Sequence, residues 1–201
     1  MIPKRIFTIW MGGEPDPITK RCIESHNIPG YEHRLITLDN CYHNQYIDEA
    51  IGATNLGVKR WCKVSDWLRL YYLFTEGGIY LDSDMEVLPG KNFDDLLDCP
   101  MFIGLDEDGN KASTALGAVA GHPALELIMN EVASNYRGSG GWIWETGFLY
   151  FTNKIAQLLP WNPLTKLLPS DYFFPYHWRD KTVNITENTR VFHHYLGSWV
   201  K

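Results

Sequence analysis

The clearest hydrophobic pattern in the chain runs from Trp61 to Pro89. Its first part repeats apolar side chains at helical spacing, namely at Val64, Trp67, Leu68, Tyr71 and Phe74. Gly77 and Gly78 then end the predicted helix, because glycine adopts the left-handed backbone that a helix C-terminus favours. The apolar run at 79–81 predicts an interior strand that leads into Asp82 and Asp84. Residues two apart on a strand share a face, so the two carboxylates are expected to point the same way.

The rest of the pattern alternates strands with helices. Strands are predicted at residues 5–10, 33–38 and 101–105, and residues 190–199 predict a last strand followed by a turn. Helices are predicted at residues 18–26, 46–51, 122–136 and 144–159. Between them, residues 113–120 are a run of small side chains, and the segment from residue 160 is rich in proline and aromatic residues and predicts loops with short strands. This alternation predicts an α/β fold whose mixed, mostly parallel central sheet is covered on both faces.

Length and composition fit a single folded domain. The chain has 201 residues, 45% of them hydrophobic, and can bury a sizeable core. Its net charge of −6 and the lack of a basic cluster argue against a nucleic-acid partner. Aromatic residues make up 14% of the chain, which suits sugar-stacking surfaces and an ordinary aromatic core equally well.

Cysteine usage and hydropathy indicate the cellular compartment of the protein. The four cysteines lack metal-type spacing and predict reduced thiols in a cytoplasmic protein; they are Cys22, Cys41, Cys62 and Cys99. The sequence begins directly on a strand pattern and has no apolar run of about 18 residues, so neither a signal peptide nor a transmembrane anchor is expected. Peripheral contact with the inner face of a membrane stays open.

Two pairs of charged residues are candidates for chemistry. Asp82 and Asp84 on one strand face would repel each other unless a cation lay between them. Carboxylate oxygens suit a hard divalent ion, which would in turn bind the phosphates of a nucleotide; the alternative is a solvated turn after an edge strand. Asp66 and Arg69 are three residues apart on one helix face, where an ordinary intrahelical ion pair is the alternative to a binding role.

Two motifs carry a family resemblance. One reads Ser65-Asp66-x-x-Arg69 followed by Gly77-Gly78-x-Tyr80-x-Asp82-x-Asp84, and the other, near the N-terminus, reads Pro3-Lys4-Arg5-Ile6-x-x-Ile9-Trp10-x-Gly12-Gly13. Both resemble glycosyltransferase family 32, and the first also resembles the DXD core of the large glucosylating bacterial toxins. The resemblance implies a GT-A-like Rossmann-type fold over residues 1–201. It also implies metal-dependent transfer from a nucleotide-diphosphate sugar, with UDP favoured over GDP, to a saccharide, glycolipid or other hydroxyl acceptor, with retention at the anomeric carbon.

The resemblance implies roles for residues on the donor side. Asp66 and Arg69, with Ser65 beside them, would hold the sugar. Trp10 would stack on the nucleotide base, and a core position is the alternative for this tryptophan. Asp66, Arg69 and Asp82 are the candidate catalytic residues.

The resemblance also implies a metal site. Asp82 and Asp84 would hold Mn²⁺ or Mg²⁺. Near the C-terminus, His194-Tyr195-Leu196-Gly197 resembles the H-x-x-G motif of family 8 glycosyltransferases, which implies His194 as a third metal ligand. Because side chains alternate along a strand, only one of His193 and His194 should face the site.

The same C-terminal resemblance places three residues over the diphosphate: Gly197, Ser198 and Trp199. On the acceptor side, Thr146-Gly147 matches part of a Thr-Gly-Pro motif of the family, with Phe148 in place of the proline. The sequence therefore leaves the donor sugar and the acceptor open. Two other classes of protein also remain open: a sugar-nucleotide hydrolase or nucleotidyltransferase with the same metal site, and a non-catalytic carbohydrate-binding domain.

Overall fold

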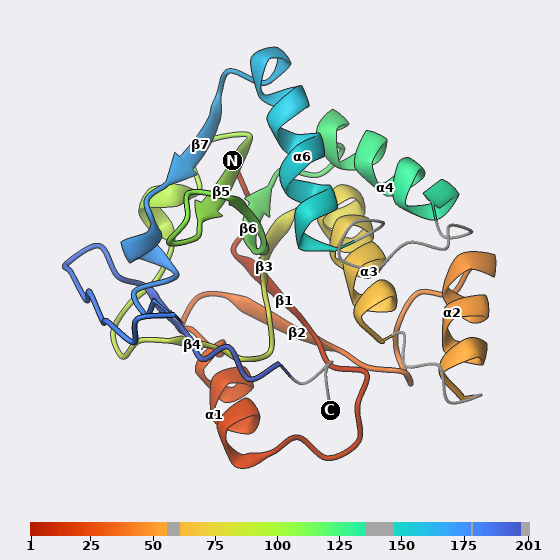
Figure 1. Cartoon of the computed structure of the whole chain (residues 1–201), viewed down its shortest axis with the longest axis horizontal. Coiled ribbons are helices and arrows are strands. Elements are labelled where there is room, and N and C mark those ends of the chain that lie inside the picture. The colour runs from red at the N-terminus through yellow and green to blue at the C-terminus, as the bar shows by residue number, and fades with distance from the viewer. Residues whose placement is uncertain (56–60, 136–146, 178, 198–201) are drawn as a thin grey trace.

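The computed structural model describes residues 1–55, 61–135, 147–177 and 179–197. Its centre is a six-stranded sheet with the strand order β2-β1-β3-β6-β5-β7 (Figure 1). The strands of this sheet are β1 (Arg5–Ile9), β2 (Glu32–Ile36), β3 (Gly78–Leu81), β5 (Met101–Leu105), β6 (Lys111–Ala118) and β7 (Thr165–Leu168). The pairs β1/β2, β1/β3 and β5/β7 are parallel, and the two pairs that involve β6 are antiparallel. The prediction of a mixed, mostly parallel sheet is confirmed.

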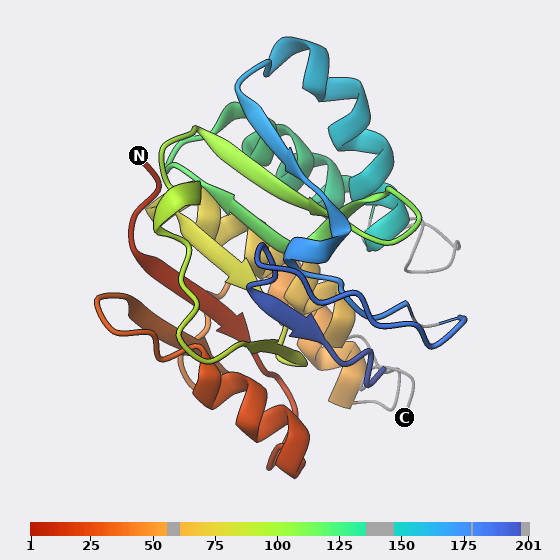
Figure 2. The ribbon, with the colours of Figure 1, turned by 90° about the vertical axis from the view of Figure 1, so that its left-hand side faces the viewer.

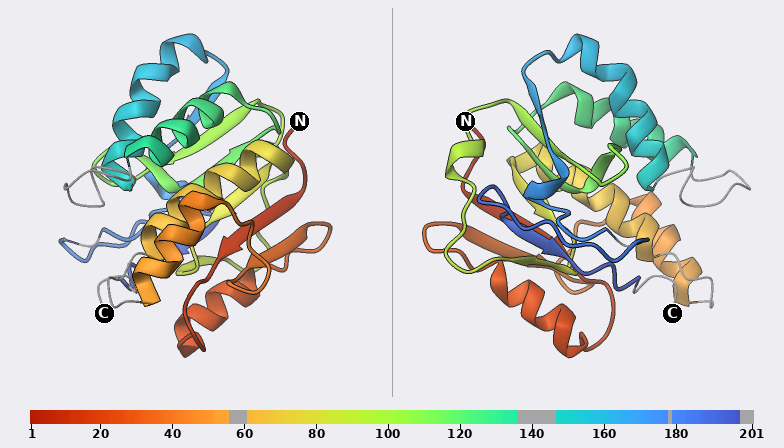
Figure 3. Two further views of the ribbon diagram at one scale, coloured as in Figure 1. Left: turned by 90° about the vertical axis from the view of Figure 1, so that its right-hand side faces the viewer. Right: turned by 60° about the vertical axis from the view of Figure 1, so that its left-hand side comes forward.

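Helices cover one face of this sheet, and a two-stranded ribbon lies over the other (Figures 2 and 3). The helices on the first face are α2 (Gln45–Asn55), α3 (Trp61–Glu76), α4 (Pro123–Asn135) and α6 (Phe148–Leu158). The antiparallel ribbon consists of β4 (Met85–Val87) and β8 (Val191–His193), and α1 (Pro17–Ser25) packs against β4. Short 3-10 turns complete the described elements: η1 (Asp94–Leu96), η2 (Leu159–Trp161) and η3 (Ser170–Tyr172).

Alternating side chains of the central strands supply a core on each face. In β3, Ile79 packs into the cluster under the ribbon, whereas its neighbour Tyr80 packs into the cluster under the helices. In β1, Ile6 and Phe7 divide in the same way. This period of two is the direct consequence of strand geometry, and it explains why such strands are apolar along their whole length.

Residues 113–118 of the run of small residues belong to β6, a strand inside the sheet that the pattern did not assign. A Cβ atom at Gly117 would lie 2.3 Å from Cε1 of Phe102 on the neighbouring strand. The small side chains therefore reflect close packing against an aromatic ring. At residues 190–199, where a strand followed by a turn was predicted, the strand is β8, which ends at His193. Residues 198 and 199 of this segment and residues 144–146 of the last expected helix lie outside the described residues.

The Gly-Gly break after α3 has the predicted backbone. Gly77 and Gly78 have φ angles of +67° and +136°, which L-residues with a side chain rarely adopt. There is also no room for a side chain, because a Cβ atom would lie 2.7 Å from the Ala120 nitrogen at Gly77 and 2.8 Å from the Arg5 oxygen at Gly78. The two glycines let α3 turn directly into β3.

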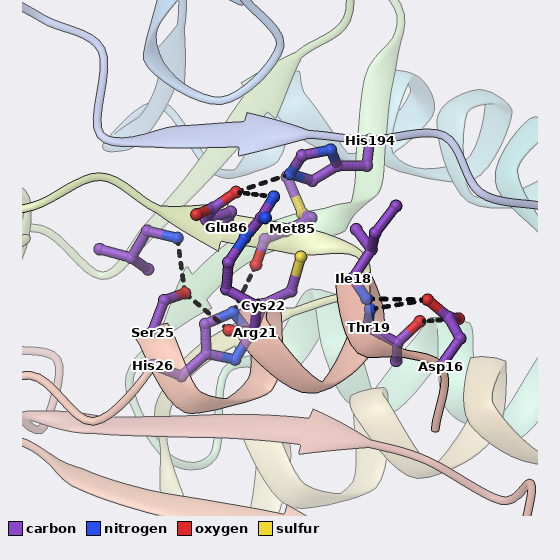
Figure 4. A network of polar contacts seen from close by, with 11 residues as sticks. Asp16, Ile18, Thr19, Arg21, Cys22, Ser25, His26, Met85, Glu86 and His194 are labelled. Atoms are coloured by element: carbon purple, nitrogen blue, oxygen red, sulfur yellow. Dashed lines mark hydrogen bonds and ion pairs between the residues drawn. The ribbon is translucent and has the colours of Figure 1, made fainter. Parts of the chain in front are cut away.

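A fully buried histidine joins β1, α1 and β4. His26 Nε2 donates to the Met85 carbonyl at 2.7 Å (Figure 4). Its Nδ1 accepts from the Thr8 hydroxyl at 2.6 Å. A carbonyl oxygen can only accept, so the neutral ring carries its proton on Nε2. Burial lowers the pKa of His26 to about 3. The imidazole therefore stays neutral in the folded protein.

This histidine makes stability depend on pH. Below about pH 6.5 the unfolded chain binds a proton at His26 and the folded protein does not, so the free energy of unfolding should fall with decreasing pH until the pKa near 3 is reached. The loss from this single group should approach about 1.4 kcal/mol per pH unit. Urea titrations between pH 7 and pH 4 measure the slope, and NMR titration of the His26 ring assigns it. A His26 ring that titrates near its ordinary pKa in the folded protein would contradict the prediction, and His43→Gln, which changes an exposed ring, is the control.

Candidate active site

A cavity of about 490 Å³ opens where the parallel strands β1 and β3 end. Ligands of open α/β sheets bind at this edge. Its walls come from the loop after β1, from α3, from the turn between β3 and β4, from the β5–β6 hairpin and from the segment after β8. Residues far apart in the sequence thus meet in one place.

Helix α3 contributes a buried ion pair. Arg69 Nη2 lies 3.0 Å from Asp66 Oδ1, and the side chains are only 7% and 6% exposed. Arg69 Nη1 donates to the Ser113 carbonyl oxygen at 2.9 Å, and the guanidinium carbon lies 4.6 Å from the centre of the Tyr80 ring. Both charged residues line the cavity. Their burial and their contacts with other elements distinguish this pair from a surface ion pair of a helix.

Asp82 and Asp84 also line the cavity, but the prediction that they lie on one face of a strand is wrong. Strand β3 ends at Leu81, and both acids lie in the turn before β4 rather than on one strand face. Asp82 Oδ1 accepts the Tyr80 hydroxyl at 2.6 Å and lies 3.6 Å from Arg69 Nη1. Burial raises the pKa of Asp82 despite the opposing charge of Arg69, and the charge of Asp84 adds to the rise. The two carboxylates therefore affect each other at close range.

Asp84 is tied to the C-terminal segment. Its Oδ2 accepts the Leu196 N–H at 3.0 Å, and its Oδ1 lies 3.2 Å from His193 Nε2. Burial alone would raise the pKa of Asp84, but the His193 charge and these hydrogen bonds lower it to about 2. The Asp84 carboxylate in turn outweighs burial and raises the pKa of His193.

His193, and not His194, faces the cavity. His194 Nε2 bonds Glu86 Oε2 at 2.8 Å on the other side of the ribbon, where Arg21 also reaches Glu86 (Figure 4). The prediction that only one of the two histidines faces the site is correct, but the choice of His194 is wrong. The pairing of Met85 with His193 decides which side of the ribbon each ring takes.

The residues at the cavity suit a divalent cation by their chemistry. Two carboxylates and an imidazole, from Asp82, Asp84 and His193, are typical ligands of manganese. Each carboxylate disfavours the charge of the other, and His193 Nδ1 is buried with no hydrogen-bond partner among the described residues. Within that part of the chain, potential ligand atoms of three residues already lie within 4.8 Å of one another only at Cys22, Glu86 and His194. There, Arg21 and His194 already pair with the Glu86 carboxylate.

Three further predicted residues line the cavity. They are Trp10, Ser65 and Gly197. The Trp10 indole N–H donates to the Gly13 carbonyl at 2.7 Å, which holds the ring at the cavity edge. Gly147 lies at the start of α6 and is not among the described residues that line the cavity. Ser198, Trp199 and Thr146 lie outside the described residues.

The acids of the β5–β6 hairpin and an aromatic residue after β8 were not predicted as site residues. Asp106, Glu107 and Tyr195 all line the cavity. The signal for the acids was present, because polar residues directly after a strand lie at the same sheet edge as other strand ends. No sequence signal joins them to Tyr195, which is 88 residues away from Glu107.

The sheet, with its cavity at the strand ends, has a GT-A-like α/β fold. The glycosyltransferase domain of PaToxG has a similar fold, with a TM-score of 0.60, 20% identity, and coverage of 79% of this chain and 70% of that domain. The ligand-free glycosyltransferase domain from the YGT toxin is also similar, with a TM-score of 0.54, 10% identity, and coverage of 83% and 79%.

Sequence comparison points to the family. Residues 18–101 match the model described as "Glycosyltransferase sugar-binding region containing DXD motif". Inositol phosphoceramide mannosyltransferase 2 of Schizosaccharomyces pombe is 26% identical over 189 residues, which cover 89% of this chain and 52% of that protein. The chain therefore spans about half the length of this curated relative. These matches confirm the resemblance to the DXD-containing glycosyltransferases of family 32. None of the described helices is long and apolar enough to cross a membrane.

The buried pair in α3 should be costly to break. Arg69→Ala removes the buried guanidinium that lies beside both Asp66 and Asp82, so the free energy of unfolding should fall by about 3–5 kcal/mol. Arg179→Ala is the control, because Arg179 pairs with Asp108 at the surface and its loss should cost at most about 1 kcal/mol. Urea unfolding at neutral pH measures both variants. Equal losses in the two variants would show that Arg69 does not neutralise buried charge.

Proposed function

We propose that this protein transfers a hexose from a nucleotide-diphosphate sugar to a hydroxyl group of a saccharide or glycolipid, and that the reaction needs a divalent cation. The observation that carries the proposal is the convergence of Asp66, Arg69, Asp82 and Asp84 on one cavity at the strand ends. If these residues formed only a solvated turn and a surface ion pair, neither a buried guanidinium nor a cavity beside them would be expected. UDP-linked donors are favoured over GDP-linked ones.

The geometry suggests how the donor would lie. Asp66 and Arg69 are held rigidly by each other and by Ser113, so they would orient the hydroxyl groups of the sugar. Trp10, held at the cavity edge by Gly13, would stack on the base. The Gly197 backbone lies at the cavity and has a φ angle of +58°, so a diphosphate could approach it closely.

In the transfer itself, the bond between the anomeric carbon and the diphosphate oxygen breaks, and its electron pair leaves with the diphosphate. The acceptor oxygen forms the new bond to the same carbon, its proton passes to the departing diphosphate oxygen, and we propose retention at that carbon. Mn²⁺ or Mg²⁺ held by Asp82, Asp84 and His193 would neutralise the charge that builds on the diphosphate. Arg69, 3.6 Å from Asp82, adds a permanent positive charge to this end of the cavity.

A donor screen tests the proposal. UDP-sugars should raise the melting temperature in the presence of manganese by more than GDP-sugars do, and neither should raise it in EDTA, because the cation links the carboxylates to the diphosphate. With a saccharide acceptor present, a glycoside should form. Free sugar as the only product would indicate a hydrolase, and ligand binding that survives EDTA would indicate a carbohydrate-binding domain.

The two neighbouring histidines give a matched test of the metal ligands. His193→Gln and Asp84→Asn should each weaken manganese-dependent donor binding at least roughly tenfold, since each removes a ligand from the cavity. His194→Gln should leave donor binding unchanged, because His194 bonds Glu86 away from the cavity. Calorimetry with a donor from the screen measures binding, and melting temperatures report on the fold. The assignment fails if His194→Gln weakens binding as much as His193→Gln does.

A further inference from the structure

One carboxylate in the cavity has an oxygen without a hydrogen-bond partner in the part of the chain that the structure describes. Glu107, in the β5–β6 hairpin, lines the cavity, and its Oε1 is buried with no hydrogen-bond partner among the described residues. Its neighbour Asp106 is different: Oδ1 accepts the N–H groups of Asp108 and Asn110 at 3.0 and 2.7 Å, and Oδ2 accepts the Asn110 side-chain amide at 3.0 Å. Asp106 thus shapes the hairpin turn, and Glu107 is the acid whose second oxygen is left for a ligand.

The other oxygen of Glu107 is held in place from the C-terminal segment. The Tyr195 hydroxyl donates to Glu107 Oε2 at 2.7 Å. Tyr195 has a φ angle of +51°, a strained conformation for a residue with a side chain. Its ring packs on His193 with 3.9 Å between ring centres, and the next N–H, from Leu196, binds Asp84. The strained residue thus aligns Glu107 with the candidate metal ligands.

The chemistry of this oxygen selects its ligand. A buried acceptor without a partner destabilises the protein, and a carboxylate is the most costly case, so a hydrogen-bond donor from the ligand is favoured there. A phosphate oxygen is excluded, because it is negatively charged and cannot donate. A sugar hydroxyl donates readily and carries no charge, and a hydrogen bond to a charged acceptor is stronger than one between neutral groups.

We propose that Glu107 is a saccharide-binding residue that accepts a hydrogen bond from a sugar hydroxyl, and that Tyr195 positions it. This inference rests on the proposed function and adds the place of the sugar: it lies toward the β5–β6 hairpin, and the diphosphate lies toward Asp84 and His193. The hydroxyl belongs either to the transferred sugar or to the acceptor, and the experiment separates these two sources.

Calorimetry in manganese tests the subsite by comparing UDP with UDP-glucose and GDP with GDP-mannose. In Glu107→Gln, which keeps the size of the side chain but turns one acceptor into a donor, affinity for the bare diphosphate should stay within twofold of wild type. Affinity for the sugar nucleotide should fall by roughly tenfold to a hundredfold. Tyr195→Phe should give a smaller loss with the same selectivity.

A matched control is available in α4, where Glu131 Oε2 accepts the Tyr150 hydroxyl at the same 2.7 Å but does not line the cavity. Glu131→Gln should change neither affinity. If the sugar-nucleotide affinity of Glu107→Gln stays normal while the KM for a saccharide acceptor rises tenfold at unchanged kcat, the hydroxyl belongs to the acceptor, and the subsite stands.

Two results would overturn the subsite: an equal loss of affinity for the bare diphosphate and for the sugar nucleotide in Glu107→Gln, or no change in any of these quantities. The first would mean that Glu107 supports the fold of the cavity or the binding of the cation, and not the sugar. A wild-type protein that binds none of the four probes would overturn the proposed function first, and the subsite with it. The two failures are therefore distinguishable.

Discussion

Confinement of negative charge at one sheet edge is the constraint on which this structure depends. Asp66, Asp82, Asp84 and Glu107 line a single cavity, and carboxylates taken out of water are stable only when they are paired. Arg69 lies beside Asp66 and Asp82, and His193 lies beside Asp84, whose pKa is about 2. The pairing within the described residues is incomplete, because Glu107 Oε1 has no partner there. A polar, cationic or hydroxyl-bearing ligand is the chemical complement of such a cavity.

The architecture explains how these groups are kept close together. The Gly-Gly turn joins α3 directly to β3, so the pair in the helix and the acids after the strand belong to one rigid corner. The ribbon of β4 and β8 brings His193 to Asp84 and leaves His194 with Glu86. Both faces of the sheet are packed by apolar cores, which anchor this corner and the ribbon to the same scaffold.

Local patterns in the sequence predicted local structure well and long-range contacts poorly. Helix α3, strand β3 and the role of Gly77 follow from periodicity and backbone freedom, and the presence of Asp66 and Arg69 at the site follows from helical spacing and motif. The choice of His194 failed because the facing of a three-residue strand is decided by its partner β4, which no local pattern specifies. Strand β6 was not predicted because its small side chains reflect packing against the Phe102 ring on the neighbouring strand. The contact of Glu107 with Tyr195 was not predicted because it joins segments that are far apart in the sequence.

Because of the order of the strands along the chain, the central sheet is synthesised before the last wall of the cavity. During synthesis, all six strands of the central sheet have left the ribosome once Leu168 has emerged, whereas Asp84 has no imidazole beside it until His193 follows. Nascent chains that stop between these two points contain every element of the sheet and both of its cores in large part, yet lack one wall of the cavity. Completion of the pocket therefore follows synthesis of the whole central sheet, and it depends on a strand of three residues.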